Sequence, residues 1–519
     1  MRLEKKSIHM NKIVKSETVT FFVNREERIM DADNEIENII NQKEMVTTDG
    51  VVTRENQITV NGTINYSILY YPKNSDTVCG EEREINFDEN IKLMGINSED
   101  SANVTMEVLS SSVKPVDGKN YIYKIQLKAY IVVEKIEDLD TVTAITEDEN
   151  IMTKKQNIDS LAIVANKNDT FRVSEQISVP QGKPPIGTIV WSDIKIKNQN
   201  IKTMEGSIIV NGQLSIFIIY TPEMENMPEQ WLEQTIDFNG QLEMNEATED
   251  VISYTELWLN NVNVQPEINQ DNEMRNLSVS ALLKLNIKLY KETSFNVIED
   301  VYKPGANLVP VPEPKIYQKL LVKNASRTKE VVKMKIDKTK GQLLQICNSQ
   351  AEIKIENILV SDNGLKAIGK IKTCIIYISS DDRHPICCQC SENNFEHRID
   401  AEGIESGDDY FINWKVEQVN ANMLNADEVE IKAVIALEAI VFKKVEQNFI
   451  MEVNQEPVDM EALNNAPVLK GYIVQKGDTL WKLAKENYTT IEKIMMVNNL
   501  ENETIKKGDR LLIIKSCQA

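Results

Sequence analysis

The sequence is poor in the residues on which most enzyme chemistry depends. Only 3 histidines occur in 519 residues, and the chain contains no G-x-S-x-G or H-E-x-x-H motif. No paired-carboxylate motif can be placed in a pocket either, so we predict that the protein is not an enzyme. A glycosidase built from two distant carboxylates would leave no motif, and it stays as the least favoured of three functional alternatives.

Long apolar runs are also missing. No run of about 18 apolar residues occurs, so we expect no transmembrane segment. The chain starts with MRLEKKSIHMNKIVKSETVTFF, which lacks the apolar core of a secretory signal. We therefore expect the protein to act in the compartment where it is made.

Positive charge is in short supply. The chain has 58 lysines and arginines against 80 aspartates and glutamates, a net charge of −22. Such a surplus repels phosphate backbones, so nucleic acid is not an expected partner. Residues 470–515 are the exception, because nine basic and six acidic residues give them a net charge of +3. A basic segment on an acidic body either suits an acidic partner or keeps the two from associating.

Cysteine is scarce and its number is odd. The 7 cysteines are thinly spread, which predicts no disulfide framework and fits a reducing compartment, with later oxidation left open. One cluster could hold zinc, and it consists of His384, Cys387, Cys388, Cys390 and His397, with Cys374 upstream. The spacing Cys387-Cys388-x-Cys390 is not a C-x2-C pair and no second pair follows. We therefore favour ordinary loop thiols and predict neither a metal nor another cofactor.

A threefold internal repeat is what the chain does contain. Segments 58–70, 208–220 and 365–377 alternate apolar and polar residues as half-buried strands do. In each segment a glycine precedes a tyrosine by eight positions, and the pairs are Gly62 and Tyr70, Gly212 and Tyr220, and Gly369 and Tyr377. A glycine inside a strand costs stability, so these three predict a bulge or a close backbone approach.

A longer alternating segment follows each glycine strand. These segments are 121–133, 277–289 and 429–441. The repeat is thus a β-rich unit of about 130–150 residues, enough for a sandwich-type core. We predict a mainly β protein with three tandem β-sandwich-like domains at residues 1–142, 158–302 and 318–450. Acidic or proline-bearing links are expected at 143–157, 303–317 and 451–469.

The C-terminal residues 470–515 have the pattern of a small β-α-α-β domain. Tyr472 and Val474 alternate as in a strand, and Gly477 suits a turn. Asp478 or Thr479 is expected to cap a first helix with a buried stripe at Leu480, Leu483 and Ala484. Thr489-x-x-Glu492 predicts a capping box for a second helix, which is expected to end at Asn498 before a closing strand at 511–514.

This module resembles the LysM family, whose members usually grip N-acetylglucosamine in cell-wall glycan. The resemblance lies in Tyr472–Ala484 and in Lys507-Gly508-Asp509-Arg510-Leu511. It implies a groove that recognises acetamido groups through backbone hydrogen bonds. One side of the groove would be Gly477, Asp478, Thr479 and Leu480, and the other Asn498, Asn499, Leu500 and Ile505.

Two further residues of the module bear on its ligand. Trp481 is expected to complete the core of the module rather than to stack on a sugar. Met496 stands where the family commonly has a polar residue, and an exposed methionine adapts well to a protein surface. The alternative, that Met496 merely covers the helix surface, stays open.

The body of the chain resembles a second family. Ser178-Val179-Pro180-Gln181-Gly182-Lys183-Pro184-Pro185-Ile186, together with the glycine strands, is similar to the domain of unknown function numbered 3794 of clostridial spore-coat proteins. The third unit lacks the proline-glycine segment. Three such units ahead of a LysM domain are the layout of a clostridial spore-coat morphogenesis protein.

The two resemblances together imply a non-enzymatic adaptor. It would bind the coat morphogenetic ATPase (spore stage IV protein A) through the groove of the LysM domain around Asp478–Trp481 and Met496–Leu500, and it would also contact other coat proteins. It would act in the mother-cell cytoplasm at the forespore surface and later in the spore coat. The alternative is a peptidoglycan-binding protein of the cell wall or cortex.

Overall fold

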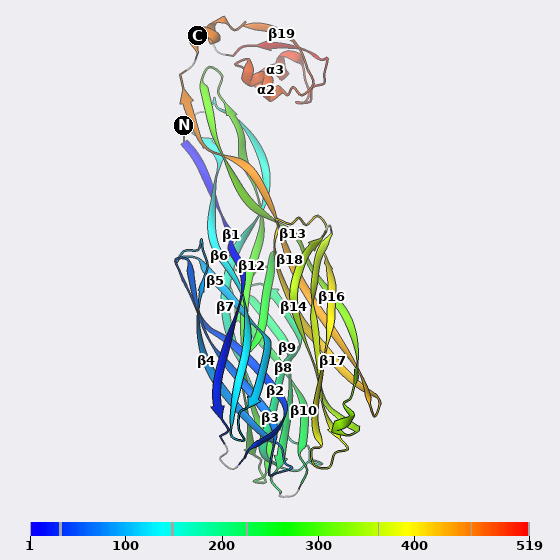
Figure 1. Cartoon of the computed structure of the whole chain (residues 1–519). Helices are drawn as coiled ribbons and strands as arrows, with labels where there is room; N and C mark the ends of the chain where they lie inside the picture. Colours follow the sequence, from blue (N-terminus) through cyan, green and yellow to red (C-terminus); the bar gives the residue numbers. More distant parts are fainter. Residues whose placement is uncertain are drawn as a thin grey trace.

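The chain forms an elongated body of antiparallel strands with a small α/β module at one end (Figure 1). The computed structural model describes residues 2–30, 34–146, 150–224, 227–361, 363–457 and 459–516. The marked N-terminus and C-terminus both lie toward the end that carries the module. The predicted mainly β fold class is confirmed.

Six consecutive strands make one unit, and the same strand order occurs three times. In each unit the first, sixth and fifth strands form one sheet, and the second, third and fourth form another. The first unit comprises β1 (Arg2–Arg28), β2 (Ile36–Arg54), β3 (Gln57–Pro72), β4 (Cys79–Lys92), β5 (Ser101–Pro115) and β6 (Asn120–Thr146). The second comprises β7 (Met152–Ser178), β8 (Ile186–Met204), β9 (Ser207–Pro222), β10 (Gln230–Glu243), β11 (Val251–Ile268) and β12 (Met274–Tyr302). The third comprises β13 (Asn307–Lys335), β14 (Leu343–Ser361), β15 (Gly364–Ser379), β16 (Ile386–Asp400), β17 (Asp409–Asn425) and β18 (Glu428–Glu456), with a single 3-10 turn at Lys338–Lys340.

The two sheets of each unit face one another as a sandwich. Alternate residues of β6 from Tyr121 to Val133 are almost completely buried, and they pack on β3, β4 and β5 in one apolar cluster. The second and third units bury the corresponding strands β12 and β18 in the same way. The alternation that the sequence shows over 121–133, 277–289 and 429–441 therefore marks the central strand of one sheet in every unit.

The three repeated glycines lie where a neighbouring strand leaves no room for a side chain, because backbone atoms come close at Gly62 and Gly369 and a phenylalanine ring does so at Gly212. Each faces a phenylalanine on the adjacent strand, in the pairs Gly62 and Phe87, Gly212 and Phe238, and Gly369 and Phe395. On the other side, the register of β2, β8 and β14 shifts opposite each glycine, which is the signature of a β-bulge. The predicted bulge or close approach is thus confirmed in all three units, and the aromatic partner is a shared feature that the sequence repeat did not reveal.

Paired strands extend beyond the sandwiches and form a stalk. β5 pairs with β6 only as far as Glu134, and beyond that point β6 pairs with β1 alone up to Thr146. β7 with β12 and β13 with β18 continue in the same manner. The three ribbons bury a common cluster that includes Ile8, Ile158 and Phe449.

The segments expected to link the units lie largely within strands. Residues 143–146 and 152–157 belong to β6 and β7, and residues 307–317 belong to β13. Residues 147–149 lie outside the described part of the chain. The third link begins with the end of β18 at Glu456 and contains α1 (Met460–Asn465). Ribbons that bury apolar side chains against one another, rather than flexible segments, join the units.

The three units pack against one another around a shared apolar centre. One apolar cluster draws residues from every unit, including Tyr71 of the first, Trp191 of the second and Ile376 of the third. The Tyr71 hydroxyl also accepts a hydrogen bond of 2.9 Å from the backbone N–H of Ile386. Each unit buries part of its apolar surface only in the presence of the other two.

The C-terminal module sits on the end of the stalk. It consists of β19 (Leu469–Ile473), α2 (Leu480–Glu486), α3 (Ile491–Asn498) and β20 (Arg510–Ile514), as the β-α-α-β expectation requires. Trp481 lies edge-on to Tyr302 of β12, with ring centroids 4.8 Å apart, and its Nε1–H donates to Asp300 Oδ2 at 2.8 Å. Lys485 Nζ donates to both oxygens of the same carboxylate, at 2.7 and 3.0 Å.

Asp300 is thus the anchor of the module. Burial alone would raise the pKa of this carboxyl, but hydrogen bonds from Lys485 and Trp481 outweigh that effect and lower it. The stabilisation it provides is therefore fully present above the ordinary pKa of about 4 and is lost as the pH falls through the lowered value.

Replacing a strand glycine with alanine tests the packing of the repeat. At Gly369 a Cβ atom would lie 2.9 Å from the backbone atoms Lys354 C and Ile355 Cα. We expect Gly369→Ala to lower the free energy of unfolding by about 1–3 kcal/mol, because a backbone cannot move aside as a side chain can. The measurement is a urea denaturation curve of the full chain.

Gly182→Ala is the matched control for this substitution. An added Cβ at Gly182 meets no atom within 4 Å. Its free energy of unfolding should stay within about 0.5 kcal/mol of the unsubstituted protein. Equal stability of the two variants would contradict the close approach at Gly369.

Replacing Asp300 with asparagine tests the anchor of the module. The substitution keeps the size of the side chain but removes the charge that holds Lys485, and we expect a loss of about 1–3 kcal/mol from the docking contact. Undocking should make the connecting segment 457–468 cleave faster at Glu461 with a glutamate-specific protease.

Glu299→Ala is the control for Asp300→Asn. Glu299 is the neighbouring acid, and it pairs with Lys154 on the stalk at 2.7 Å. Its loss should leave cleavage at Glu461 unchanged. Identical cleavage rates for Asp300→Asn and the unsubstituted chain would show that the carboxylate does not hold the module.

Candidate functional site

The first side of the expected groove is the turn between β19 and α2. Gly477 is exposed and has a φ of 93°, a left-handed conformation that favours glycine. Thr479 is the N-cap of α2, and its side chain accepts from the backbone N–H of Lys482 at 3.2 Å. Of the two expected capping residues, Thr479 is therefore the correct one.

Asp478 has a different task in the same turn. Its carboxylate accepts hydrogen bonds from the backbone N–H of Gln475 at 2.8 Å and from the Tyr472 hydroxyl at 2.9 Å. These bonds lower the pKa of Asp478. The side chain thus fixes the shape of the loop and leaves its backbone as the surface offered to a ligand.

Leu480 does not line a surface. Only 1% of it is exposed, and it packs in the core of the module with Val474, Leu483 and Ile494. The resemblance places the position beside the groove, and the structure places the side chain beneath it. A charge at this position would disrupt the core of the module, so it is no probe of ligand binding.

The second side of the groove begins at the end of α3. The Asn498 side chain accepts from Leu512 N at 2.7 Å and donates to Leu512 O at 2.8 Å, so it ties the helix to the edge of β20. Asn499 is exposed and caps α3 in the left-handed conformation, with φ 53° and ψ 41°. Leu500 and Ile505 are half-buried against the core of the module.

The start of α3 differs from the expected capping box. Thr490, one residue later than predicted, is the N-cap, and its side chain accepts from Lys493 N at 3.2 Å. Thr489 is fully buried and shares a hydrogen bond of 3.0 Å with the Ser516 hydroxyl. Adjacent threonines carry the same capping chemistry, and packing of the C-terminal strand decides between them.

Trp481 is not confined to the core of its own module. It is half-buried, and its indole faces the stalk through Tyr302 and Asp300. Trp481 packs on the core of the module as expected, and it also packs on Tyr302 of the second unit. No pattern within the module pointed to this contact, because its other half lies about 180 residues earlier in the chain.

The outer face of the small sheet carries exposed apolar side chains that the sequence analysis did not single out. Leu469 and Ile473 alternate on the outer face of β19, and Leu512 of β20 pairs with Gly471 on that same face. Met496 on α3, which the sequence analysis expected to be exposed, is 72% exposed. The signal for the sheet face was present in the run Leu511–Ile514, because a strand covered on one side alone needs only one apolar face.

The candidate zinc cluster is dispersed. Cys387 and Cys388 are buried in two different apolar clusters, because neighbouring strand residues point to opposite faces. His397 Nε2 lies 2.7 Å from the Ser326 hydroxyl. Within the described residues, no group of three or more His, Cys, Asp or Glu side chains could hold a metal ion.

The remaining member, Cys390, forms a disulfide with Cys374. The two residues face one another across β15 and β16. The sequence predicted no disulfide framework and left oxidation open, and among the described residues this is the one bridge. Among the described residues, Cys79, Cys347, Cys387 and Cys388 are free thiols.

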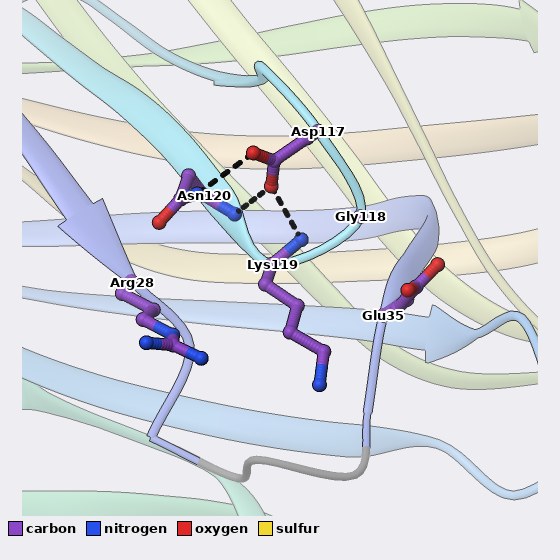
Figure 2. A pocket seen from close by; sticks show the side chains of 6 residues that line it. All are labelled: Arg28, Glu35, Asp117, Gly118, Lys119 and Asn120. Carbon is purple, nitrogen blue, oxygen red and sulfur yellow. Dashed lines mark hydrogen bonds between the residues drawn. The ribbon is translucent and has the colours of Figure 1, made fainter.

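An open hollow lies at the end of the first unit opposite the module. Figure 2 shows the residues around it, and they are Arg28, Glu35, Asp117, Gly118, Lys119 and Asn120. The Asp117 carboxylate accepts from the backbone N–H groups of Lys119 at 2.9 Å and Asn120 at 2.7 Å, and from the Asn120 side chain at 2.8 Å. These bonds lower the pKa of Asp117 and close the turn between β5 and β6. The hollow is thus a product of turn geometry, and the candidate functional site remains the C-terminal module.

Comparisons with known families agree with this division of the chain. The family model described as "SipL, SPOCS domain" matches residues 35–116, 185–267 and 342–424, which span the second to fifth strands of each unit. The third match lies within the third unit, so this unit is a SPOCS domain even though it lacks the proline-glycine segment. The LysM domain model matches residues 472–513. No curated protein and no solved structure matched the chain.

The two family assignments indicate a sporulation-related protein with a peptidoglycan-binding type of module. Both families are non-catalytic binding domains, the SPOCS domains relate the chain to sporulation, and LysM is a peptidoglycan-binding type of module. No helix in the described ranges is both long and apolar enough to cross a membrane. The chain therefore contains three SipL SPOCS domains in tandem, followed by a LysM domain.

Proposed function

We propose that this protein is a non-enzymatic morphogenetic adaptor of the spore coat. Its LysM domain captures the coat morphogenetic ATPase, and its three SPOCS domains connect that ATPase to other coat proteins. It acts in the mother-cell cytoplasm at the forespore surface and ends up in the coat. The three SPOCS domains support this proposal, because one lies in each of the three units and relates that unit to sporulation.

The observation that carries the proposal is the apolar surface of the LysM domain. Exposed Met496, Leu469, Ile473 and Leu512 offer side-chain contacts of the kind that protein partners cover. A methionine in such a place adapts to the shape of a partner. Glycan binding through backbone groups needs none of these four side chains.

The arrangement of the module on the stalk supports the same role. The Asp300 anchor holds α2 against the second unit, and Met496 of α3 and the outer face of the small sheet stay exposed. The module is therefore presented at a fixed place, far from the loops at the opposite end of the body (Figure 1). A binding module held at one end of a long body suits a protein that links one layer to the next.

A second function, peptidoglycan binding, rests on the loops of the expected groove. Gly477 and Asn499 are exposed, so their backbone groups are open to a sugar. The protein would then be a component of the cell wall or cortex. The two functions use different surfaces of one small domain and can be separated by substitution.

Replacing Met496 with glutamate is the test of the proposed function. A charge placed on an apolar contact surface repels a partner and leaves the core of the module intact, since the side chain points into solvent. We expect Met496→Glu to reduce capture of the coat ATPase by at least about tenfold. The measurement is affinity capture with the full chain from sporulating cells, followed by detection of that ATPase.

Met94→Glu is the matched control, because Met94 in the first unit is also 72% exposed. It should capture the ATPase as the unsubstituted chain does. Sedimentation with purified peptidoglycan is measured on the same proteins. Failure to capture the ATPase combined with strong, Met496-independent binding to peptidoglycan would establish the second function instead.

A further inference from the structure

A buried amine and a buried carboxylate meet where the three units join. Lys288 Nζ on β12 lies 2.7 and 2.6 Å from the two carboxylate oxygens of Glu134 on β6, and both side chains are 3% exposed. Phe411 on β17 of the third unit covers the amine, with its ring centroid 4.2 Å from Nζ. Asn11 Nδ2 on β1 also donates to Glu134 Oε1 at 2.7 Å, so side chains of all three units meet here.

A second carboxyl group lies beside the pair. Glu256 on β11 accepts hydrogen bonds from the Tyr254 hydroxyl at 3.0 Å and from Asn286 Nδ2 at 3.3 Å. Tyr254 is the cross-strand neighbour of Lys288, and Asn286 that of Glu256, so the acid lies diagonally across from the amine. Burial raises the pKa of Glu256, which favours its protonated form.

The surroundings of the pair are largely aromatic. Tyr290 and Phe442 are buried nearby, with ring centroids 5.1 Å apart, and Phe411 packs on Phe442 at 5.7 Å. Such packing keeps the two side chains in one fixed contact, away from solvent. The neutral amine is the nucleophile and the neutral acid is the electrophile in amide formation. Their fixed contact replaces a chance encounter with a high effective concentration.

From this geometry we propose that Lys288 and Glu134 condense to an isopeptide bond that joins the first unit to the second. The Lys288 nitrogen attacks Glu134 Cδ and forms the new C–N bond. One C–O bond of the carboxyl group breaks, and its oxygen leaves as water with one proton from the acid and one from the amine. Glu256 carries the proton from nitrogen to the leaving oxygen and returns to its original state.

The other ion pairs of the described residues lack this combination. Arg83 and Glu81 are well buried, but a guanidinium is not a nucleophile. Lys128 lies 3.6 Å from Glu107, and Lys443 pairs with Asp408 at 3.3 Å while a quarter of its side chain is exposed. Only the Lys288 pair joins full burial, direct contact and a neighbouring acid in this part of the chain.

The intact mass of the full chain tests the proposal. The protein is purified, fully reduced to open the disulfide, denatured and weighed by mass spectrometry. We expect a mass below that of the sequence by one water molecule. Proteolysis should release a branched peptide in which Glu134 and Lys288 are joined.

Two variants assign the chemistry. Lys288→Arg keeps a cation beside Glu134 but removes the nucleophile, and Glu256→Gln keeps the shape of the neighbouring group but removes its proton carrier. Both should have their full sequence mass. A folded, unsubstituted protein at full sequence mass, or a lost water that maps to other residues, would overturn the proposal. The unsubstituted protein decides the matter even where a variant fails to fold.

Discussion

The structure depends on the joint burial of three units around one centre. Tyr71, Trp191 and Ile376 come from different units and share one apolar cluster, and the Glu134–Lys288 contact with Phe411 does the same with polar groups. Apolar burial of this kind is not directional, whereas a buried polar group must meet its partner at one place. Because a buried polar group without its partner costs about 1–3 kcal/mol, the polar contact favours one arrangement of the three sandwiches.

The three copies of the internal repeat are not independent of one another. Each SPOCS unit has a complete sandwich core of its own, yet it leaves apolar side chains uncovered that only the other two units bury. The long first and last strands of every unit continue the association into the stalk. Three copies in one chain therefore form one rigid body, and the loops at the two ends are held at fixed positions relative to each other.

Contacts between distant parts of the chain also fix the position of the LysM domain. One carboxylate, Asp300, engages two residues of α2, and one aromatic ring of the stalk meets Trp481. The anchor selects which face of the domain is covered and which face is offered to a partner. Trp481 lies in the segment that the LysM model matches, and in this chain it holds the LysM domain on the stalk.

Much of the fold was accessible from the sequence, because it rests on local periodicity. The alternation around Gly62, Gly212 and Gly369 predicted strands in the correct places, and the spacing of Leu480, Leu483 and Ala484 predicted α2. The surface of the module was less accessible from the sequence. Burial of Leu480 agrees with its expected place in the helix stripe, whereas the bond from Asn498 to β20 and the exposed face at Ile473 and Leu512 depend on how the elements pack.

The sequence by itself determined the three β units, the β-α-α-β module and the shortage of catalytic groups, since each follows from residue type and short-range spacing. Only the tertiary structure decided that the links are strands, that Cys374 meets Cys390, that Trp481 faces Asp300 and that Lys288 meets Glu134. These contacts join residues far apart in the chain. A periodic pattern states which face of a strand is apolar, but it does not state which other face will cover it.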